Sequence, residues 1–255
     1  MIKKEFPILE FDSDKDAIIR PANVVKSVNA PEQCVLCFFD DAIEKILSQY
    51  NNKVISQFGA GSLRFPLYEL DYKGKKIALM QAGVGAPIAA AQIEELVVAG
   101  CKKFIVCGMC GVLEHNIPVG NLLIPTVAVR DEGTSYHYIE PSREIEADGR
   151  IVQIIEDTLN EENIPHIKVK TWTTDAFFRE TKKKVELRKS EGCVTVEMET
   201  SAYIAAARYN NVEFGQILCA GDSLAGEEWD HRGYHCRKTV MEYVLRLSLD
   251  ACTKT

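Results

Sequence analysis

Apolar runs alternate along the chain with segments in which apolar residues recur every three or four positions. The apolar runs predict buried strands, and the periodic segments predict helices that pack on one face. The strands are expected at 33–39, 75–83, 102–112, 120–130, 166–174 and 214–222, and the helices at 40–50, 88–100, 149–164 and 234–249. Strands that alternate with helices indicate an α/β fold with a central mixed, mostly parallel sheet flanked by helices.

No linker, internal repeat or low-complexity stretch interrupts this pattern. We therefore expect a single domain over residues 1–255, with residues 1–32 as an N-terminal extension that packs on it. Ligands of such folds bind beyond the carboxyl ends of the strands. The candidate site segments are GVGAP (83–87), GMCG (108–111), TTDAFF (173–178), VEMET (196–200) and GDSLAG (221–226).

Composition and charge narrow the class of partner. The net charge is -7, so no general attraction for nucleic acid or anionic lipid is indicated. No apolar run reaches the length of a membrane span, and acidic residues interrupt the N-terminal segment before any signal-like core. We expect a cytoplasmic protein. The nine cysteines mostly lie in strand-like runs, which favours reduced buried thiols and no metal site.

The VEMET segment places two carboxylates, Glu197 and Glu199, around Met198 where an apolar run passes into a helix. One interpretation is that acidic residues in the first helical turn interact favourably with the helix dipole. The other is that a carboxylate directed into a pocket accepts hydrogen bonds from the two hydroxyls of a ribose, with the methionine against the sugar ring. The residues alone support both interpretations equally.

Two further strand ends carry candidate catalytic or binding residues. Asp222 follows an apolar strand, where it is either a turn former or a general acid with a raised pKa. Phe177 and Phe178 are adjacent aromatic residues, which more often belong to a core, but a ring at a strand end also suits stacking on a base.

Taken together, these segments resemble the nucleoside phosphorylase superfamily, which includes purine nucleoside and uridine phosphorylases and the methylthioadenosine/adenosylhomocysteine nucleosidases. The resemblance runs from about Gln33 to the C-terminus and rests on VEMETSA (196–202), GDSLAG and the block at 108–138. It implies cleavage of the N-glycosidic bond of a small-molecule nucleoside through an oxocarbenium-like transition state. It also implies no metal or organic cofactor, and a homodimer or a hexamer built as a trimer of dimers.

The resemblance assigns roles to the candidate residues. Met198 and Glu199 would hold the ribose, with Glu199 on its 2′ and 3′ hydroxyls and Glu197 as a supporting neighbour. Phe177 falls where the family stacks an aromatic ring on the base. Asp222 falls where purine-cleaving members keep the acid that interacts with N7, which favours a purine.

The same resemblance places three more residues at the substrate. Gly108 and Met109 fall at the glycine-rich strand end that lines the site. Arg232, or Arg237 as the alternative, would approach Asp222 from a segment at 226–233 that resembles a lid over the base.

The phosphate ligands of the family are absent. The phosphate-binding turn reads CFFDDAIEK, with Phe38 in place of its glycine and Ala42 in place of its arginine. Burying a phosphate dianion without cationic partners costs several kcal/mol. The sequence therefore lacks the standard phosphate-binding site of the family.

Three alternatives follow from that loss. Inorganic phosphate remains a co-substrate if Arg64 or Arg130 binds it, although Arg130 equally suits an ordered surface loop. Water attacks instead if Asp40 or Asp41 orients it, as in a nucleosidase. The third alternative is a nucleoside-binding module without catalysis, and the presence of both Glu199 and Asp222 argues against it.

Overall fold

The computed structural model describes residues 3–59, 63–233 and 238–255. Within these ranges, ten strands form one mixed sheet. The strands are β1 (Gln33–Cys37), β2 (Asn52–Phe58), β3 (Phe65–Tyr72), β4 (Lys75–Gln81), β5 (Lys103–Val112), β6 (Leu122–Asp131), β7 (Glu144–Glu146), β8 (His166–Thr174), β9 (Cys193–Glu197) and β10 (Glu213–Ser223). The helices are α1 (Pro21–Val24), α2 (Asp40–Leu47), α3 (Ala86–Ala99), α4 (Gly149–Glu161), α5 (Lys182–Ser190), α6 (Thr200–Tyr209) and α7 (Lys238–Thr253), with short 3-10 turns η1 (Pro7–Leu9), η2 (Ser135–His137) and η3 (Phe177–Arg179).

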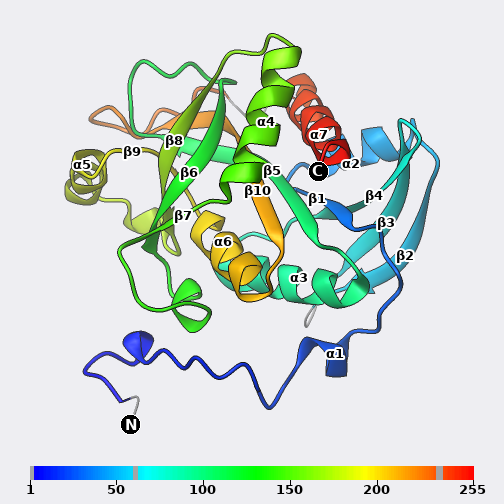
Figure 1. The fold of residues 1–255 in the computed structure, drawn as a ribbon. Coiled ribbons are helices and arrows are strands. Elements are labelled where there is room, and N and C mark those ends of the chain that lie inside the picture. The colour runs from blue at the N-terminus through cyan, green and yellow to red at the C-terminus, as the bar shows by residue number, and fades with distance from the viewer. Residues whose placement is uncertain (1–2, 60–62, 234–237) are drawn as a thin grey trace.

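Helices cover both faces of the sheet (Figure 1). Alternate residues of a strand point to opposite faces, and β1 shows the result. Val35 and Cys37 pack in a core with α2, α4 and α7, whereas Cys34 and Leu36 pack in a second core with α3 and α6. This arrangement confirms the predicted α/β class with a mixed sheet flanked by helices.

Part of the sheet closes on itself. The pairings run from β5 to β10, then to β6, β8 and β9, and β9 pairs with β5 again. Strands β5 and β10 are parallel to each other, as are β6, β8 and β9, and the two groups run in opposite directions. The result is a five-stranded, barrel-like ring at one end of the sheet.

The closure of the ring brings the carboxyl ends of three strands together. Near the end of β5, Gly111 pairs with Val196 of β9 in antiparallel register, so the two strands end close to each other. Beside them, Ser223 of β10 pairs with Val112 of β5. The segments that follow β9 and β10 therefore begin at the same place, although their strands run in opposite directions.

The N-terminal extension contacts the rest of the chain at separated points. The backbone N–H of Ala30 donates to Ala99 O of α3, and Lys15 Nζ donates to Tyr209 O at the end of α6. Figure 1 shows the segment before α1 running as an extended strip along the outside of the molecule. Ile18 and Ile19 on this strip are exposed.

Most of the expected elements appear within a few residues of their predicted bounds. Pro125 lies where the register of β6 against β8 shifts by one residue, so an inner strand tolerates it through an irregularity. Strands β2 and β3 carry many exposed or half-buried positions, and their pattern did not predict them. No helix in the described part of the chain is long and apolar enough to span a bilayer.

Candidate active site

The turn between β9 and α6 is held by the first of the two carboxylates. Glu197 is buried and accepts hydrogen bonds from Thr173 Oγ1 at 2.7 Å and from the backbone N–H groups of Glu199 and Thr200 at 2.7 and 2.6 Å. Burial nevertheless raises the pKa of Glu197, against the effect of these donors. Glu197 thus fixes the backbone on which Glu199 stands.

The second carboxylate does not cap its own helix. Glu199 occupies the N-cap position of α6, but its Oε1 accepts the backbone N–H of Gly85 at 2.5 Å, at the start of α3. Only 6% of Glu199 is exposed. Burial, and then the charge of Glu197, raise the pKa of Glu199 to about 8. A buried carboxyl group with a strongly raised pKa is a candidate for a functional site.

A third carboxylate lies at the end of β10 beside an indole. Asp222 Oδ2 accepts a hydrogen bond from Trp229 Nε1 at 2.6 Å, and 63% of Trp229 is exposed. Arg232 reaches back to the same strand end and donates to the carbonyls of Gly221 and Asp222 at 2.9 and 3.2 Å. The contact of Arg232 is therefore with the backbone of Asp222. The alternative residue, Arg237, lies outside the described part of the chain.

Two aromatic rings and a carboxylate follow β8. The sequence pointed to the rings but not to the carboxylate. Phe177 and Phe178 are 50% and 87% exposed, and their ring centroids are 4.1 Å apart. They are not part of the core. Glu180 ends the same 3-10 turn, and burial followed by the charge of Asp222 raises its pKa to about 7. Just before the rings, Asp175 lies close enough to contribute to the raised pKa of Glu199.

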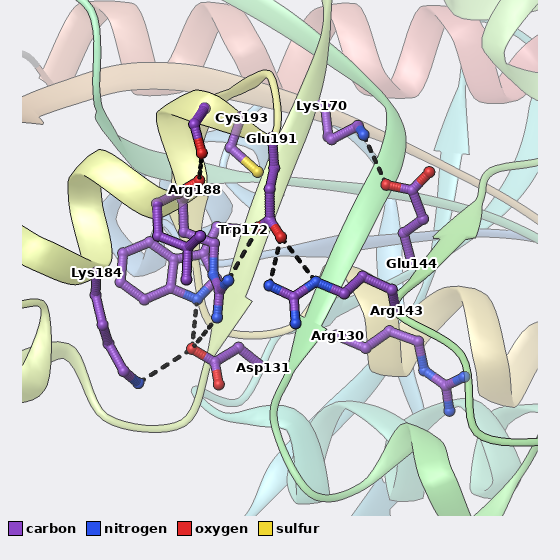
Figure 2. A network of polar contacts seen from close by, with 12 residues as sticks. Arg130, Asp131, Arg143, Glu144, Lys170, Trp172, Lys184, Arg188, Glu191 and Cys193 are labelled. Atoms are coloured by element: carbon purple, nitrogen blue, oxygen red, sulfur yellow. Dashed lines mark hydrogen bonds and ion pairs between the residues drawn. The ribbon is translucent and has the colours of Figure 1, made fainter.

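A polar network anchors α5 beneath this loop (Figure 2). Asp131 accepts hydrogen bonds from Trp172 Nε1 at 3.0 Å and Lys184 Nζ at 3.1 Å, and it pairs with Arg188 at 3.0 Å. Burial alone would raise the pKa of Asp131, but the hydrogen bonds from Arg188 and Lys184 outweigh it and lower that pKa. The start of α5, and with it the loop that carries Glu180, is fixed to the sheet.

Arg130 holds the loop at 131–142 in place by hydrogen bonds. Its guanidinium donates to Ser135 Oγ at 2.9 Å, Ser142 Oγ at 2.7 Å and Glu140 O at 2.8 Å, and Figure 2 shows it directed away from the Asp131 network. Beside it, Glu132 accepts the hydroxyl of Ser201 in α6 at 2.9 Å. These buried contacts tie the loop to the helix that begins at Glu199.

The comparison with family models gives one match, the Phosphorylase superfamily, over residues 33–248. The chain belongs to this superfamily. The match begins at the first residue of β1 and ends within α7, so it includes every strand of the sheet and each of the site residues described above. The resemblance inferred from the sequence is confirmed.

Relatives within the Phosphorylase superfamily include nucleoside phosphorylases. A guanosine phosphorylase of Halorubrum lacusprofundi is 27% identical over 208 residues, which are 78% of this chain and 84% of the relative. A DeoD-type purine nucleoside phosphorylase of Aliivibrio fischeri is 24% identical, with 72% and 77% covered.

Solved structures share the fold. The uridine phosphorylase of Vibrio fischeri ES114 matches with a TM-score of 0.76 at 19% identity, covering 96% of this chain and 100% of the other. The AMP nucleosidase of Bacteroides thetaiotaomicron matches with a TM-score of 0.71 at 20% identity, covering 89% of each chain.

An aromatic ring lies beside the glycine-rich end of β5. A Cβ atom placed on Gly108 of β5 would lie 2.7 Å from Cδ2 of Phe38. The phenylalanine ring therefore packs directly on the glycine-rich strand end that the sequence assigned to the substrate. The next residue, Met109, is half-buried at the edge of the same core. The space beside Gly108 is consequently apolar on this side.

The remaining candidates for a phosphate or water site lie on α2 and just before β3. Asp40 and Asp41 are exposed in the first turn of α2, and Asp41 pairs with Lys238 of α7. Arg64 lies just before β3, where its Nη1 donates to Leu63 O at 2.8 Å. The structure thus brings Glu197 and Glu199 together, and Asp222 with Arg232. It ties Arg130 into the 131–142 loop.

Proposed function

We propose that this protein cleaves the N-glycosidic bond of a purine-type nucleoside through a transition state with positive charge on the ribose. The observation that carries the proposal is Glu199. Its carboxyl group is almost fully buried, reaches across to the Gly85 turn, and has a pKa raised to about 8. Ribose hydroxyls supply donors to such a group, and Met198 beside it is half-buried and offers an apolar surface to the sugar.

The proposed roles divide the charge that develops during the reaction. Electrons of the breaking bond flow into the base, where Asp222 hydrogen-bonds or protonates the leaving group. The exposed ring of Phe177 supplies a stacking surface for that base. Positive charge grows on the ribose, where Glu199 in its ionised form stabilises it more than it stabilises the neutral substrate. Because the pKa of Glu199 is about 8 in the free protein, the hydrogen bonds that the ribose hydroxyls donate would favour this ionised form in the complex. Gly108 and Met109 line the sugar from β5, and Arg232 holds the strand end that carries Asp222.

The second candidate reaction is hydrolysis, and the position of Phe38 favours it. Its ring packs on Gly108, so this side of the site offers an apolar surface to the nucleophile. A buried phosphate dianion needs cationic partners, and the guanidinium of Arg130 already has protein acceptors. In a phosphorylase Arg64 or Arg130 would bind phosphate, and in a hydrolase Asp40 or Asp41 would orient water. The fold is compatible with both reactions, since a phosphorylase and a nucleosidase share it.

Base release from adenosine, inosine, guanosine, methylthioadenosine and uridine, each with and without phosphate, tests the proposal. We expect purine release that Glu199→Gln reduces about a hundredfold to a thousandfold without unfolding the protein. Ribose 1-phosphate formed only with phosphate identifies a phosphorylase, and free ribose formed regardless of phosphate identifies a hydrolase. Saturable nucleoside binding without base release over long incubation would refute catalysis and leave a binding module.

The assembly is a separate part of the proposal. We expect a homodimer or a hexamer built as a trimer of dimers, because members of the family assemble this way and the N-terminal extension exposes Ile18 and Ile19. Sedimentation velocity tests this expectation, and a monomer at micromolar concentration would contradict it.

A further inference from the structure

The turn after β10 that carries Trp229 is fixed to the sheet at its base. Ser223 and Asp230 exchange two backbone hydrogen bonds, from Ser223 N–H to Asp230 O at 2.8 Å and from Asp230 N–H to Ser223 O at 3.0 Å. Just beyond, the guanidinium of Arg232 donates to the carbonyl of Ile117 at 2.7 Å. The backbone of Trp229, next to this bridge, is therefore held against the end of β10.

The side chain of Trp229 directs its one polar group at a carboxylate of that strand end. The indole Nε1–H donates to Oδ2 of Asp222 at 2.6 Å. The indole is 63% exposed, and its ring contacts that of His231 edge-on, with the centroids 5.3 Å apart. Because most of the ring stays in water, burial contributes little to its placement. The hydrogen bond to Asp222 is a charge-assisted one when that carboxylate is ionised, and it accounts for the direction of the indole.

The two oxygens of Asp222 face different neighbours. Oδ2 is on the indole, whereas Oδ1 lies 3.6 Å from the position that a Cβ atom on Gly111 of β5 would occupy. Cγ1 of Val196, at the end of β9, lies 3.0 Å from that same position. No hydrogen bond from the described part of the chain reaches Oδ1. Oδ1 is thus the oxygen on the side of the glycine-rich end of β5, where the substrate is expected.

The chemistry of the indole determines what each oxygen can do. Trp has an N–H donor and no acceptor, so Oδ2 accepts from it whether Asp222 is ionised or neutral. An added proton on Asp222 is therefore carried by Oδ1. The terminal torsion of an Asp side chain has no sharp preference of its own. Without the indole, the carboxyl group is free to exchange the positions of its two oxygens.

We propose that Trp229 is a positioning residue that holds Oδ2 of Asp222, so that Oδ1 faces N7 of the purine and carries the proton for the leaving base. The inference rests on the proposed function, because it states how Asp222 performs its role there. The sequence assigned a contact with Asp222 to Arg232, but that guanidinium contacts the backbone carbonyl, and the side chain is held by Trp229.

The exposed indole also permits a different role, in which its ring itself stacks on the base. Lys182 at the start of α5 pairs with Glu227 in the same turn and joins it to the loop after β8 at their exposed surface. The turn thus lies beside the loop that carries Phe177. A stacking role would act independently of Asp222, whereas a positioning role acts only through it. A double-variant cycle separates the two.

Trp229→Phe removes the N–H and keeps an aromatic ring. We expect kcat/KM for purine nucleosides to fall about tenfold to a hundredfold, the effect of one hydrogen bond to a charged group. The loss should fall mainly on kcat, because the interaction with N7 strengthens as the bond to the base breaks. In an Asp222→Ala background, the same change should cost about threefold or less. Glu228→Gln, at an exposed position in the same turn, is the matched control and should keep the wild-type rate.

Two kinetic results would overturn the inference. One is an equal loss from Trp229→Phe in the wild-type and Asp222→Ala backgrounds, which is the result for stacking. The other is a loss of less than about threefold in the single variant. Either result, obtained while nucleosides are still cleaved, leaves the proposed function intact.

The contact is also visible without turnover. The chain has two tryptophans, so 15N-labelled tryptophan gives two indole signals, and Trp229→Phe identifies the one from Trp229. Asp222→Ala should shift that signal, and an unchanged signal would refute the contact.

Binding of free adenine and free hypoxanthine, measured by calorimetry, keeps the test open if no nucleoside is cleaved. In that case the proposed cleavage is wrong. Base binding that Trp229→Phe weakens by at least about threefold, and no further in the Asp222→Ala background, still supports the inference. Equal binding in the wild type and Trp229→Phe, or no binding at all, overturns it.

Discussion

Replacing the carboxyl group of Glu199 by an amide is expected to stabilise the protein at alkaline pH while it removes activity. Glu199→Gln keeps the size of the side chain, and its amide oxygen still accepts the Gly85 N–H that Oε1 accepts at 2.5 Å. What it removes is the negative charge. That charge is unfavourable in the free protein, because burial and Glu197 raise the pKa of Glu199 to about 8.

The sign and size of the effect follow from linkage. A carboxyl group whose pKa is higher in the folded than in the unfolded protein stabilises the fold at low pH, and this contribution is lost as pH rises through the folded pKa. Between the ordinary pKa of 4.5 and the folded value of about 8 lie about 3.5 units, worth about 1.4 kcal/mol each. The upper limit of the stability gained by Glu199→Gln is therefore about 5 kcal/mol. Water that enters the site makes the gain smaller, and we expect it to remain at least about 2 kcal/mol.

Urea denaturation of the wild type, Glu199→Gln and the exposed control Glu186→Gln at pH 5 and pH 9 measures this effect. At pH 5 the free energies of unfolding of the wild type and Glu199→Gln should agree within about 1 kcal/mol. At pH 9 the variant should be more stable by about 2–5 kcal/mol, and the control should show no such gain. A Glu199→Gln variant that is equally or less stable than the wild type at pH 9 would refute the reasoning.

Three further changes test other parts of the molecule. Asp222→Asn should lower kcat/KM for purine nucleosides at least about a hundredfold and leave uridine far less affected, and equal losses would contradict a role at the base. Ser201→Ala removes the hydroxyl that donates to buried Glu132 and should lower the free energy of unfolding by about 1–3 kcal/mol in urea. Gly108→Ala places a Cβ 2.7 Å from Phe38 and should destabilise by about 1–3 kcal/mol, with Phe38→Leu restoring most of the loss in the double variant; simple additivity would argue against this contact.

The elements that the sequence predicted well are those whose pattern expresses burial directly. The helix at 149–164 is amphipathic, and it appears as α4 with Ile151 and Ile155 in the core. Strand β2 lacks such a pattern because most of its residues are exposed or half-buried, whereas the buried apolar residues of β3 are interrupted by half-buried and exposed ones. The ring was also beyond prediction, because it depends on the antiparallel pairing of β5 with β9, which alternation of strands and helices does not encode.

The same distinction explains which site residues the sequence revealed and which it did not. Glu197 and Glu199 stood out because carboxylates in an apolar context require a partner, and the structure supplies Thr173 and Gly85 as donors from distant segments. Glu180 did not stand out, because it lies in a charged stretch before α5 that reads as a solvated surface. Burial and then the charge of Asp222 raise its pKa, and both act only in the folded protein.

The ring places the two expected parts of the substrate on different segments of the chain. The sugar is expected at the β9–α6 turn, whose backbone is fixed by buried Glu197, whereas the base is expected between the loops after β8 and β10. Lys182 and Glu227 join those loops only at their exposed surface. If the proposed roles are right, a change of nucleobase requires changes in these two surface segments only, and the β9–α6 turn and the core beneath it stay as they are.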